Sequence, residues 1–242
     1  MSTTINKEEI QKFSKLADEW WDVNGKFKPL HMFNPIRIEY ISGQIKKHYN
    51  FSKDKVNFLQ GLSILDIGCG GGLISEPMAR LGGEVTGIDA SEKNIQVAKI
   101  HSDENKLKIK YLNKSPEKLE NKEKFDIILN LEIVEHVDNV GLYIASCHNL
   151  LKDNGLMFTA TLNRTFMSYL KAIIGAEYIL RWLPIGTHDW NKFLKPEELE
   201  KMLQNEKFFT VDMKGLEFNP ILNKWKKSDN LSVNYIVSST KN

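Results

Sequence analysis

A glycine-rich segment, LDIGCGGG, occupies residues 65–72 and separates an apolar run from a stretch with helical spacing. Residues 62–68 have the composition of a buried strand, and residues 73–81 place apolar side chains at the spacing of a helix. Glycine is favoured in such a turn because the backbone takes positive φ angles and approaches a ligand so closely that a Cβ atom would collide. A strand, a glycine-rich turn and a helix in this order predict an α/β fold with a nucleotide or nucleoside site at the turn.

Strand-like and helix-like patterns alternate along the rest of the chain, which predicts βαβ units and a mostly parallel sheet. Ser91 is a favourable N-cap for a helix over residues 92–104, and Pro196 suits the first turn of a helix over residues 195–206. Residues 1–50 have an aromatic, helical pattern and precede the sheet. The further expected strands are EVTGID (84–89), KIKYL (108–112), FDIILNL (125–131), LMFTATL (156–162) and LSVNYIVSS (231–239).

Composition narrows the function classes. The 242 residues suit one α/β domain, and a net charge of +2 leaves no strong positive field for nucleic acid. Two cysteines, Cys69 and Cys147, are too few for a disulfide framework and favour a reducing cytoplasm. The first residues lack the basic and apolar regions of a secretory signal, which also favours a cytoplasmic location.

Two acidic residues beside the glycine turn indicate which nucleoside it binds. Asp89 ends the second strand, where a carboxylate accepts hydrogen bonds from both ribose hydroxyls. A dinucleotide fingerprint requires a third glycine at the position of Leu73, so NAD is disfavoured. Asp66, directly before Gly68 and Gly70, would repel a phosphate and suit a cationic ligand. S-adenosylmethionine has an adenosine, an ammonium and a sulfonium, and it has no phosphate.

The sequence resembles the class I S-adenosylmethionine-dependent methyltransferases, and within them the bacterial ubiquinone-biosynthesis O-methyltransferases. The glycine turn is generic to the superfamily. The more specific matches are the segments at residues 20–41 and 175–199, with FKPLH-x-x-NP-x-R and THD-x-x-KF-x-x-P-x-EL, and the late VNY at residues 233–235. The resemblance implies a Rossmann-like fold with a mostly parallel seven-stranded sheet and helices on both faces. An N-terminal helical segment (1–50) would cover the site of the methyltransferase domain (51–242), and a lid insertion (162–195) would follow the fifth strand.

The resemblance also assigns cofactor contacts. It implies that Gly68 and Asp89 contact S-adenosylmethionine, that Leu131 lies beside the adenine and that Arg37 reaches the cofactor from the N-terminal segment. Leu131 ends the fourth expected strand, at the sheet edge where such folds bind ligands. The planar guanidinium of Arg37 would pair with the methionine carboxylate, unless it is an ordinary surface arginine.

LEIVEHV, residues 131–137, brings three ligand-type residues within one turn. His136 is a candidate general base for a phenolic hydroxyl, with Glu135 beside it. Alternatively, Glu132, Glu135 and His136 hold a divalent cation such as Mg²⁺ that lowers the pKa of this hydroxyl. A structural role in shaping the loop is a third interpretation. His188 in GTHDW is a second candidate base.

The most apolar stretch, residues 166–183, is hydrophobic on nearly every side of a helical wheel, and Arg164, Lys171 and Arg181 lie in or next to it. It contains too many charges for a membrane span but has the composition of an interfacial element. The hypothesis is a lid that also contacts the surface of the inner membrane; a buried lid helix or a homodimer contact is the alternative.

These features together predict an O-methyltransferase that acts on ring hydroxyls of polyprenylated phenols or catechols at both O-methylation steps of ubiquinone biosynthesis. It would be cytoplasmic, peripherally associated with the inner membrane, and in contact with other enzymes of the pathway. The alternatives are a methyltransferase for another small acceptor, a non-catalytic peripheral membrane scaffold, and an NAD oxidoreductase. Intact Asp66, Gly68, Gly70 and Asp89 argue against the scaffold, and Leu73 argues against the oxidoreductase.

Overall fold

A single mixed sheet forms the centre of the computed structural model, which describes residues 3–120, 122–170, 189–219, 222 and 224–241. Its strand order is β3-β2-β1-β4-β5-β8-β6-β7. The first five strands of this order are parallel, and β8, β6 and β7 are each antiparallel to their neighbours. The strands are β1 (Ser63–Ile67), β2 (Glu84–Asp89), β3 (Lys110–Asn113), β4 (Phe125–Leu131), β5 (Leu151–Leu162), β6 (Phe208–Asn219), β7 (Lys224–Ser228) and β8 (Asn234–Lys241).

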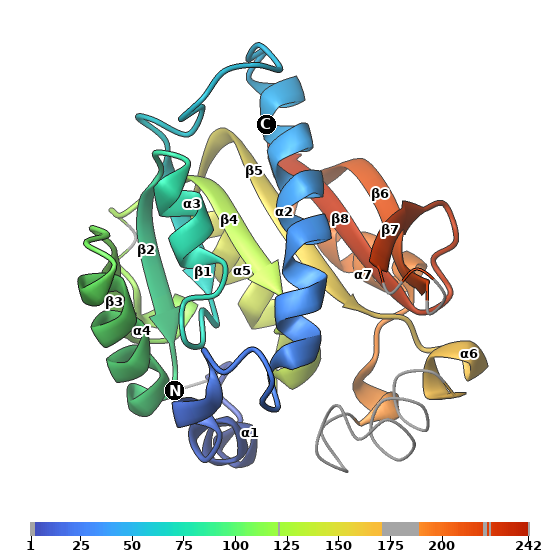
Figure 1. Cartoon of the computed structure of the whole chain (residues 1–242). Helices are drawn as coiled ribbons and strands as arrows, with labels where there is room; N and C mark the ends of the chain where they lie inside the picture. Colours follow the sequence, from blue (N-terminus) through green and yellow to red (C-terminus); the bar gives the residue numbers. More distant parts are fainter. Residues whose placement is uncertain (1–2, 121, 171–188, 220–221, 223, 242) are drawn as a thin grey trace.

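Helices cover both faces of the sheet (Figure 1). Asn6 caps the first helix through its side chain, and Ser91 caps α4 as predicted. Pro196 begins α7, also as predicted, because proline lacks the N–H that the first helical turn leaves unbonded. The helices are α1 (Lys7–Ser14), α2 (Lys28–His48), α3 (Ser75–Arg80), α4 (Glu92–Glu104), α5 (Val140–Leu150), α6 (Phe166–Ser168) and α7 (Pro196–Asn205), with short 3₁₀ turns η1 (Ala17–Glu19), η2 (Pro116–Lys118), η3 (Val134–His136) and η5 (Trp190–Lys192).

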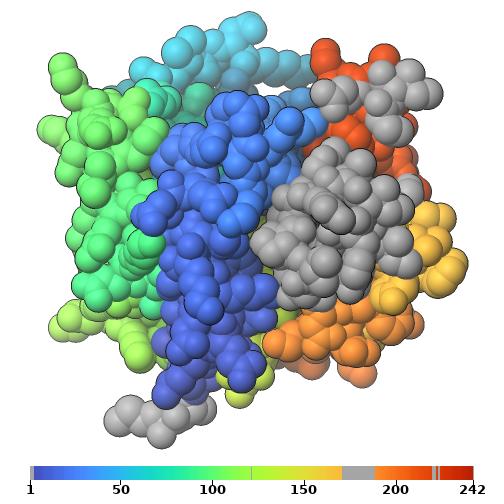
Figure 2. All heavy atoms as spheres, turned by 60° about the horizontal axis from the view of Figure 1, so that its bottom comes forward, coloured from blue at the N-terminus to red at the C-terminus, as the bar shows by residue number. Residues whose placement is uncertain are grey.

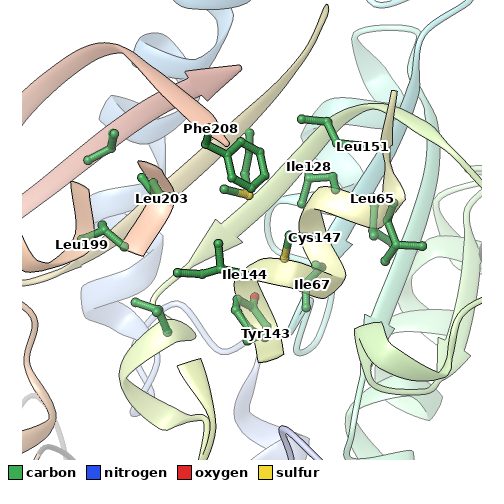
Figure 3. Close-up of a cluster of buried hydrophobic side chains, with 14 of the residues drawn as sticks. Leu65, Ile67, Ile128, Tyr143, Ile144, Cys147, Leu151, Leu199, Leu203 and Phe208 are labelled. Carbon is green, nitrogen blue, oxygen red and sulfur yellow. The ribbon is translucent and has the colours of Figure 1, made fainter. Parts of the chain in front are cut away.

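The hydrophobic core is divided by the sheet into two layers because strand side chains alternate between its faces. Leu65 and Ile67 of β1 pack with α5 and α7 on one side, whereas Ile64 packs with α2 and α3 on the other. Figure 3 shows the first layer, in which Tyr143 and Cys147 of α5 lie against the strands. This two-sided burial holds the ends of the strands at fixed positions.

The sequence analysis predicted six strands and did not predict β6 or β7. The described sheet has eight strands, so the implied number of seven was wrong. The additional edge strand β7 has the sequence KWKKS, whose four polar residues carry no strand signal. Pairing with β6 makes it a strand: Trp225 lies opposite Phe218, and its ring packs against Phe33 of α2. The mostly parallel fold with helices on both faces is confirmed.

The N-terminal segment lies across the carboxyl ends of the parallel strands. In Figure 1 these strands point downward, toward α1. Figure 2 turns this edge forward and shows the N-terminal residues running over it, between the green segments near residue 100 and the yellow and orange ones beyond residue 160. The backbone amide of Asp138 donates to the carbonyl of Thr4, which ties the start of the chain to the loop after β4. The described part of this segment contains α1 and α2, and it lies where doubly wound folds bind ligands.

Candidate active site

A cavity of about 670 Å³ opens at the carboxyl ends of β1, β2 and β4 and continues between α2 and the β6–β7 hairpin. Such a volume is typical of sites for small molecules and cofactors. The sequence analysis assigned ten residues to the site, and seven of them line the cavity. Gly70 and Glu135 are not among its lining residues, and His188 lies outside the described residues. Those that line it are Arg37, Asp66, Gly68, Asp89, Leu131, Glu132 and His136.

The glycine turn forms one wall of the cavity, and its conformation requires glycine. Gly68 and Gly70 have φ angles of 68° and 54°, in the left-handed region that other residues rarely adopt. A Cβ atom on Gly68 would lie 2.1 Å from Cδ1 of Ile133, and one on Gly70 would lie 2.4 Å from the ring of Trp20. The turn therefore has a bare backbone at a place where side chains from two other segments already press against it.

Asp89 lies at the end of β2, where its carboxylate is held by the neighbouring backbone. Oδ2 accepts a hydrogen bond from the amide of Gly70 (3.0 Å), and Oδ1 accepts one from the amide of Ser91 (2.7 Å). Burial raises the pKa of Asp89, and these hydrogen bonds act in the opposite direction. The carboxylate is thus aimed across the tip of the glycine turn, and its remaining lone pairs can accept the two hydroxyls of a ribose.

Asp66 lies at the base of the turn and is almost fully buried, with 3% of its surface exposed. Its Oδ2 accepts a hydrogen bond from the hydroxyl of Ser75 (2.6 Å). Burial raises its pKa to about 7, and the charge of Asp89 adds to this effect, while the Ser75 hydrogen bond opposes it. A cation in the cavity would favour the ionised form of Asp66, whereas a phosphate would not.

Two tryptophans attach the N-terminal segment to the glycine turn. Trp20 stacks on Phe27 with 3.8 Å between ring centroids, and its Nε1 donates to Oδ1 of Asn94 (3.0 Å). Trp21 stacks on His101 at 3.4 Å, and its Nε1 donates to the carbonyl of Gly71 (2.9 Å). Both indoles are therefore held by ring stacking and hydrogen bonds within the protein, which gives this pair a structural role.

Arg37 and Glu132 form a buried ion pair in the cavity wall. The guanidinium Nη2 lies 2.5 Å from Oε1 of Glu132, and only 2% of Arg37 is exposed. Glu132 has a φ angle of 58°, an uncommon conformation for a residue with a side chain, and this turns the backbone at the end of β4. The side chain of Arg37 is therefore inside the cavity wall and is not an ordinary surface arginine. Its contact with a cofactor carboxylate stays a prediction.

Glu135 and His136, the other two ligand-type residues of segment 131–137, have different partners. Glu135 is buried, and its Oε2 accepts a hydrogen bond from Thr161 (2.8 Å), while Oε1 has no hydrogen-bond partner among the described residues. Burial, and then the charge of Glu132, raise the pKa of Glu135 well above its usual range. His136 lines the cavity, and its Nδ1 lies 2.9 Å from Oε2 of Glu9.

This arrangement bears on the predicted cation site. Within the described ranges, no three His, Cys, Asp or Glu side chains lie close enough together to hold a metal ion. Glu132 is engaged by Arg37 and His136 by Glu9, so both would have to change partners to bind a cation jointly. The cation site stays a prediction, and His188 lies outside the described residues.

Sequence reasoning missed several residues that the fold brings to the cavity. Glu9 is separated from His136 by more than half of the chain, and no local pattern connects them. Phe33, Phe218 and Trp225 line the part of the cavity between α2 and the β6–β7 hairpin. Their contacts depend on the edge strand β7, which had no strand signal in the sequence.

The chemistry of the walls fits an adenosine that carries a cation and no phosphate: a bare glycine turn, a carboxylate placed for a ribose, and a second buried carboxyl. Residues 65–159 match the model of a methyltransferase domain. The structure of magnesium protoporphyrin IX methyltransferase from Synechocystis PCC 6803 with bound SAM has the same fold, with a TM-score of 0.66, 16% sequence identity and 100% coverage of both chains. The fold and the site define a class I S-adenosylmethionine-dependent methyltransferase.

Two relatives identify the family within this class. A ubiquinone biosynthesis O-methyltransferase of Pelagibacter ubique (strain HTCC1062) is 58% identical over 240 residues, which cover 99% of each chain. Another, from Bartonella bacilliformis (strain ATCC 35685 / KC583 / Herrer 020/F12,63), is 52% identical and covers 97% of this chain and 95% of its own. The chain belongs to the family of ubiquinone biosynthesis O-methyltransferases, and its methyl donor is S-adenosylmethionine.

Proposed function

We propose that this enzyme methylates ring hydroxyls of polyprenylated phenols and catechols, and that it serves both O-methylation steps of ubiquinone biosynthesis. One observation carries this proposal: a single cavity joins the glycine turn and its two acids to an apolar space between α2 and the β6–β7 hairpin. A nucleoside cofactor and an apolar aromatic acceptor can therefore occupy one continuous cavity. Family membership supports a quinone-type substrate.

The cofactor side of the cavity binds and orients the donor. In this proposal Asp89 accepts the ribose hydroxyls, Leu131 contacts the adenine, and the backbone of Gly68 and Gly70 allows close approach. Asp66 favours the ammonium group through its negative charge. S-adenosylmethionine supplies a methyl group on a sulfonium that already contains the leaving group, so the protein mainly has to align the reactants and exclude water.

We assign the general base to His136. Glu9 accepts a hydrogen bond from Nδ1, which leaves Nε2 able to take the proton of the acceptor hydroxyl. The hydrogen bond from His136 is the largest of the effects that lower the pKa of Glu9, so this carboxylate remains ionised and stabilises an imidazolium. His188 is the alternative base. Glu135 positions the loop through Thr161, and a divalent cation at Glu132, Glu135 and His136 is the alternative way to activate the hydroxyl.

A steady-state assay tests this assignment. His136→Ala should lower kcat for methylation of a prenylated catechol by about 10²–10⁴-fold, because a positioned base contributes that much, while the affinity for S-adenosylhomocysteine stays unchanged. Glu9→Gln should lower kcat less, since it retains the ring and loses only the charge that supports it. His48→Ala is the matched control, because His48 bonds the carbonyl of Asn154 away from the cavity. A fully active His136→Ala enzyme would contradict the assignment and favour His188.

We also propose a peripheral contact with the inner membrane, next to the cavity entrance. None of the helices in the described part of the chain has the length and hydropathy of a membrane-spanning helix. Phe166 is 72% exposed, and Met167, Tyr169 and Leu170 are also exposed, which is unusual for four apolar residues within five positions. Residues 171–183 of the predicted contact lie outside the described residues.

A vesicle-pelleting assay tests the membrane contact. The wild type should sediment with vesicles that contain anionic lipid, and Phe166→Ser with Leu170→Ser should reduce the sedimented fraction because it removes exposed apolar area. Phe209→Ser is a suitable control, because Phe209 is 54% exposed on β6 and does not line the cavity. No sedimentation of folded wild-type protein would contradict the proposal. A contact with other enzymes of the pathway is a further expectation, which co-purification would test.

A further inference from the structure

Three aromatic side chains form a continuous surface between α2 and the β6–β7 hairpin. Phe33 of α2 and Trp225 of β7 lie 4.1 Å apart between ring centroids, and Phe218 of β6 lies 5.5 Å from Trp225. Phe33 is buried, whereas the other two are half-buried. All three line the cavity, and we call them the aromatic wall.

The inner end of the aromatic wall adjoins the cofactor side of the cavity. The guanidinium of Arg37 packs over the ring of Phe33, with its central carbon 3.8 Å from the ring centroid. The same guanidinium bonds Glu132, which directly follows Leu131 at the end of β4. Arg37 therefore connects the aromatic wall to the residues beside the glycine turn, and a ligand on the wall would extend away from the reacting atoms.

The outer end of the aromatic wall leads toward exposed apolar residues. Leu170 lines the cavity, is 37% exposed and is the last described residue of the apolar stretch that begins with Phe166. Leu162 and Leu216, both buried, line the same cavity. Apolar side chains thus continue from the surface near α6, past the aromatic wall, to Arg37.

We propose that the aromatic wall binds the isoprenoid side chain of the acceptor, next to its ring; this rests on the proposed function. An isoprenoid chain is apolar and branched, so it gains from large aromatic surfaces and needs no hydrogen-bonding partner. The wall is assigned to the acceptor because its rings come from α2 and the β6–β7 hairpin, whereas the glycine turn, Asp66 and Asp89 lie at the ends of β1 and β2. Trp225 is chosen for substitution because it is half-buried and lies on β7, at the edge of the described sheet.

The test compares acceptors that differ in tail length. We would measure KM and kcat for catechols that carry no, one, two or three isoprene units, with the wild type, Trp225→Ala and Trp225→Phe. Phe51→Ala is the control, because Phe51 is a half-buried aromatic residue that stacks on Tyr49 outside the cavity. Affinity for S-adenosylhomocysteine verifies that each variant retains the folded cofactor site.

With the wild type, KM should fall as isoprene units are added. Trp225→Ala should raise KM for the three-unit acceptor about tenfold and change KM for the bare catechol less than about twofold, because only the tail loses a contact. Trp225→Phe should restore most of the difference, and Phe51→Ala should behave as the wild type. An equal rise for all acceptors would mean that Trp225 contacts the ring, and no change for any acceptor would mean that it contacts neither; either result overturns the proposal.

A binding measurement separates this proposal from the proposed function. Calorimetry would follow a geranylated phenol binding to the complex with S-adenosylhomocysteine, which needs no turnover. Weaker binding to Trp225→Ala, together with no methyl transfer by the wild type, would retain the tail site and refute the proposed reaction. Normal turnover by the wild type, together with equal binding to both proteins, would retain the reaction and refute the tail site.

Discussion

The buried carboxyl of Asp66 makes a quantitative prediction about stability and pH. An aspartate in an unfolded chain has a pKa of about 4, whereas burial raises the pKa of Asp66 in the folded protein to about 7. Below about pH 3 the carboxyl is protonated in both states and pH has no effect through this group. Between these two pKa values the unfolded chain ionises first, so the folded state loses stability as pH rises. Above about pH 7 both states are ionised and the loss is complete.

The expected loss follows from the difference between the two pKa values. Each pKa unit corresponds to about 1.4 kcal/mol, so the full loss from this carboxyl is about 4 kcal/mol. Asp66→Asn removes the titration and keeps an oxygen that can accept the hydrogen bond from Ser75. The stability of this variant relative to the wild type should therefore increase by about 3–4 kcal/mol between about pH 4 and pH 8. Urea unfolding of both proteins at several pH values measures this difference.

Asp126→Asn is a control in the same sheet, because the stability contributed by Asp126 should change with pH in the opposite direction. Burial tends to raise the pKa of Asp126, but hydrogen bonds from Lys152 and Ser63 outweigh it, so the pKa is lowered. Ionised Asp126 therefore stabilises the folded state, and this stabilisation is lost as pH falls through the acidic range. A stability difference between Asp66→Asn and wild type that stays constant with pH would refute the argument, because it would mean that Asp66 is ionised in the folded protein as it is in the unfolded chain.

Three further predictions concern the glycine turn, the ribose acid and the thiols. Asp89→Ala should weaken the binding of S-adenosylhomocysteine at least tenfold by calorimetry, because two hydroxyls lose a charged acceptor, and NADH should not bind the wild type; unchanged affinity would exclude the ribose contact. Gly70→Ala should lower the free energy of unfolding by about 2 kcal/mol, since it combines a positive φ with a clash against Trp20, whereas Gly43→Ala, in open space on α2, should raise it by about 0.5–1 kcal/mol; equal effects would contradict the steric argument. Both cysteines are buried and burial raises the pKa of each thiol, but Cys69 lines the cavity; Cys147 lies in the core and should not react with a thiol reagent until the protein is unfolded in urea.

Local patterns predicted the part of the site that is built from consecutive residues. The glycine turn and Asp66 follow β1 directly, and Asp89 ends β2, so a strand-turn-helix pattern was enough to place them at one sheet edge. Leu131 and Glu132 follow β4 in the same way. These positions could be inferred because the carboxyl ends of adjacent parallel strands always meet.

Long-range partners could not be inferred in this way. The sequence suggested a carboxylate of the cofactor for Arg37, and the fold supplies Glu132. The sequence grouped His136 with two glutamates in one turn, and the fold pairs it with Glu9 of the N-terminal segment. The backbone at Glu132 takes a positive φ, which separates the three side chains in a way that spacing along the chain does not reveal.

The sequence by itself determined the class of fold, the nucleoside chemistry of the glycine turn and the family, because each of these depends on residue types at short, fixed spacings. Only the tertiary structure decided which side chains face one another across the cavity: Glu9 beside His136, Glu132 beside Arg37, and Trp225 beside Phe33. The physical reason is that these contacts join segments far apart along the chain, and their energies depend on burial and pairing that exist only after the sheet, its edge strand β7 and the N-terminal segment have packed together.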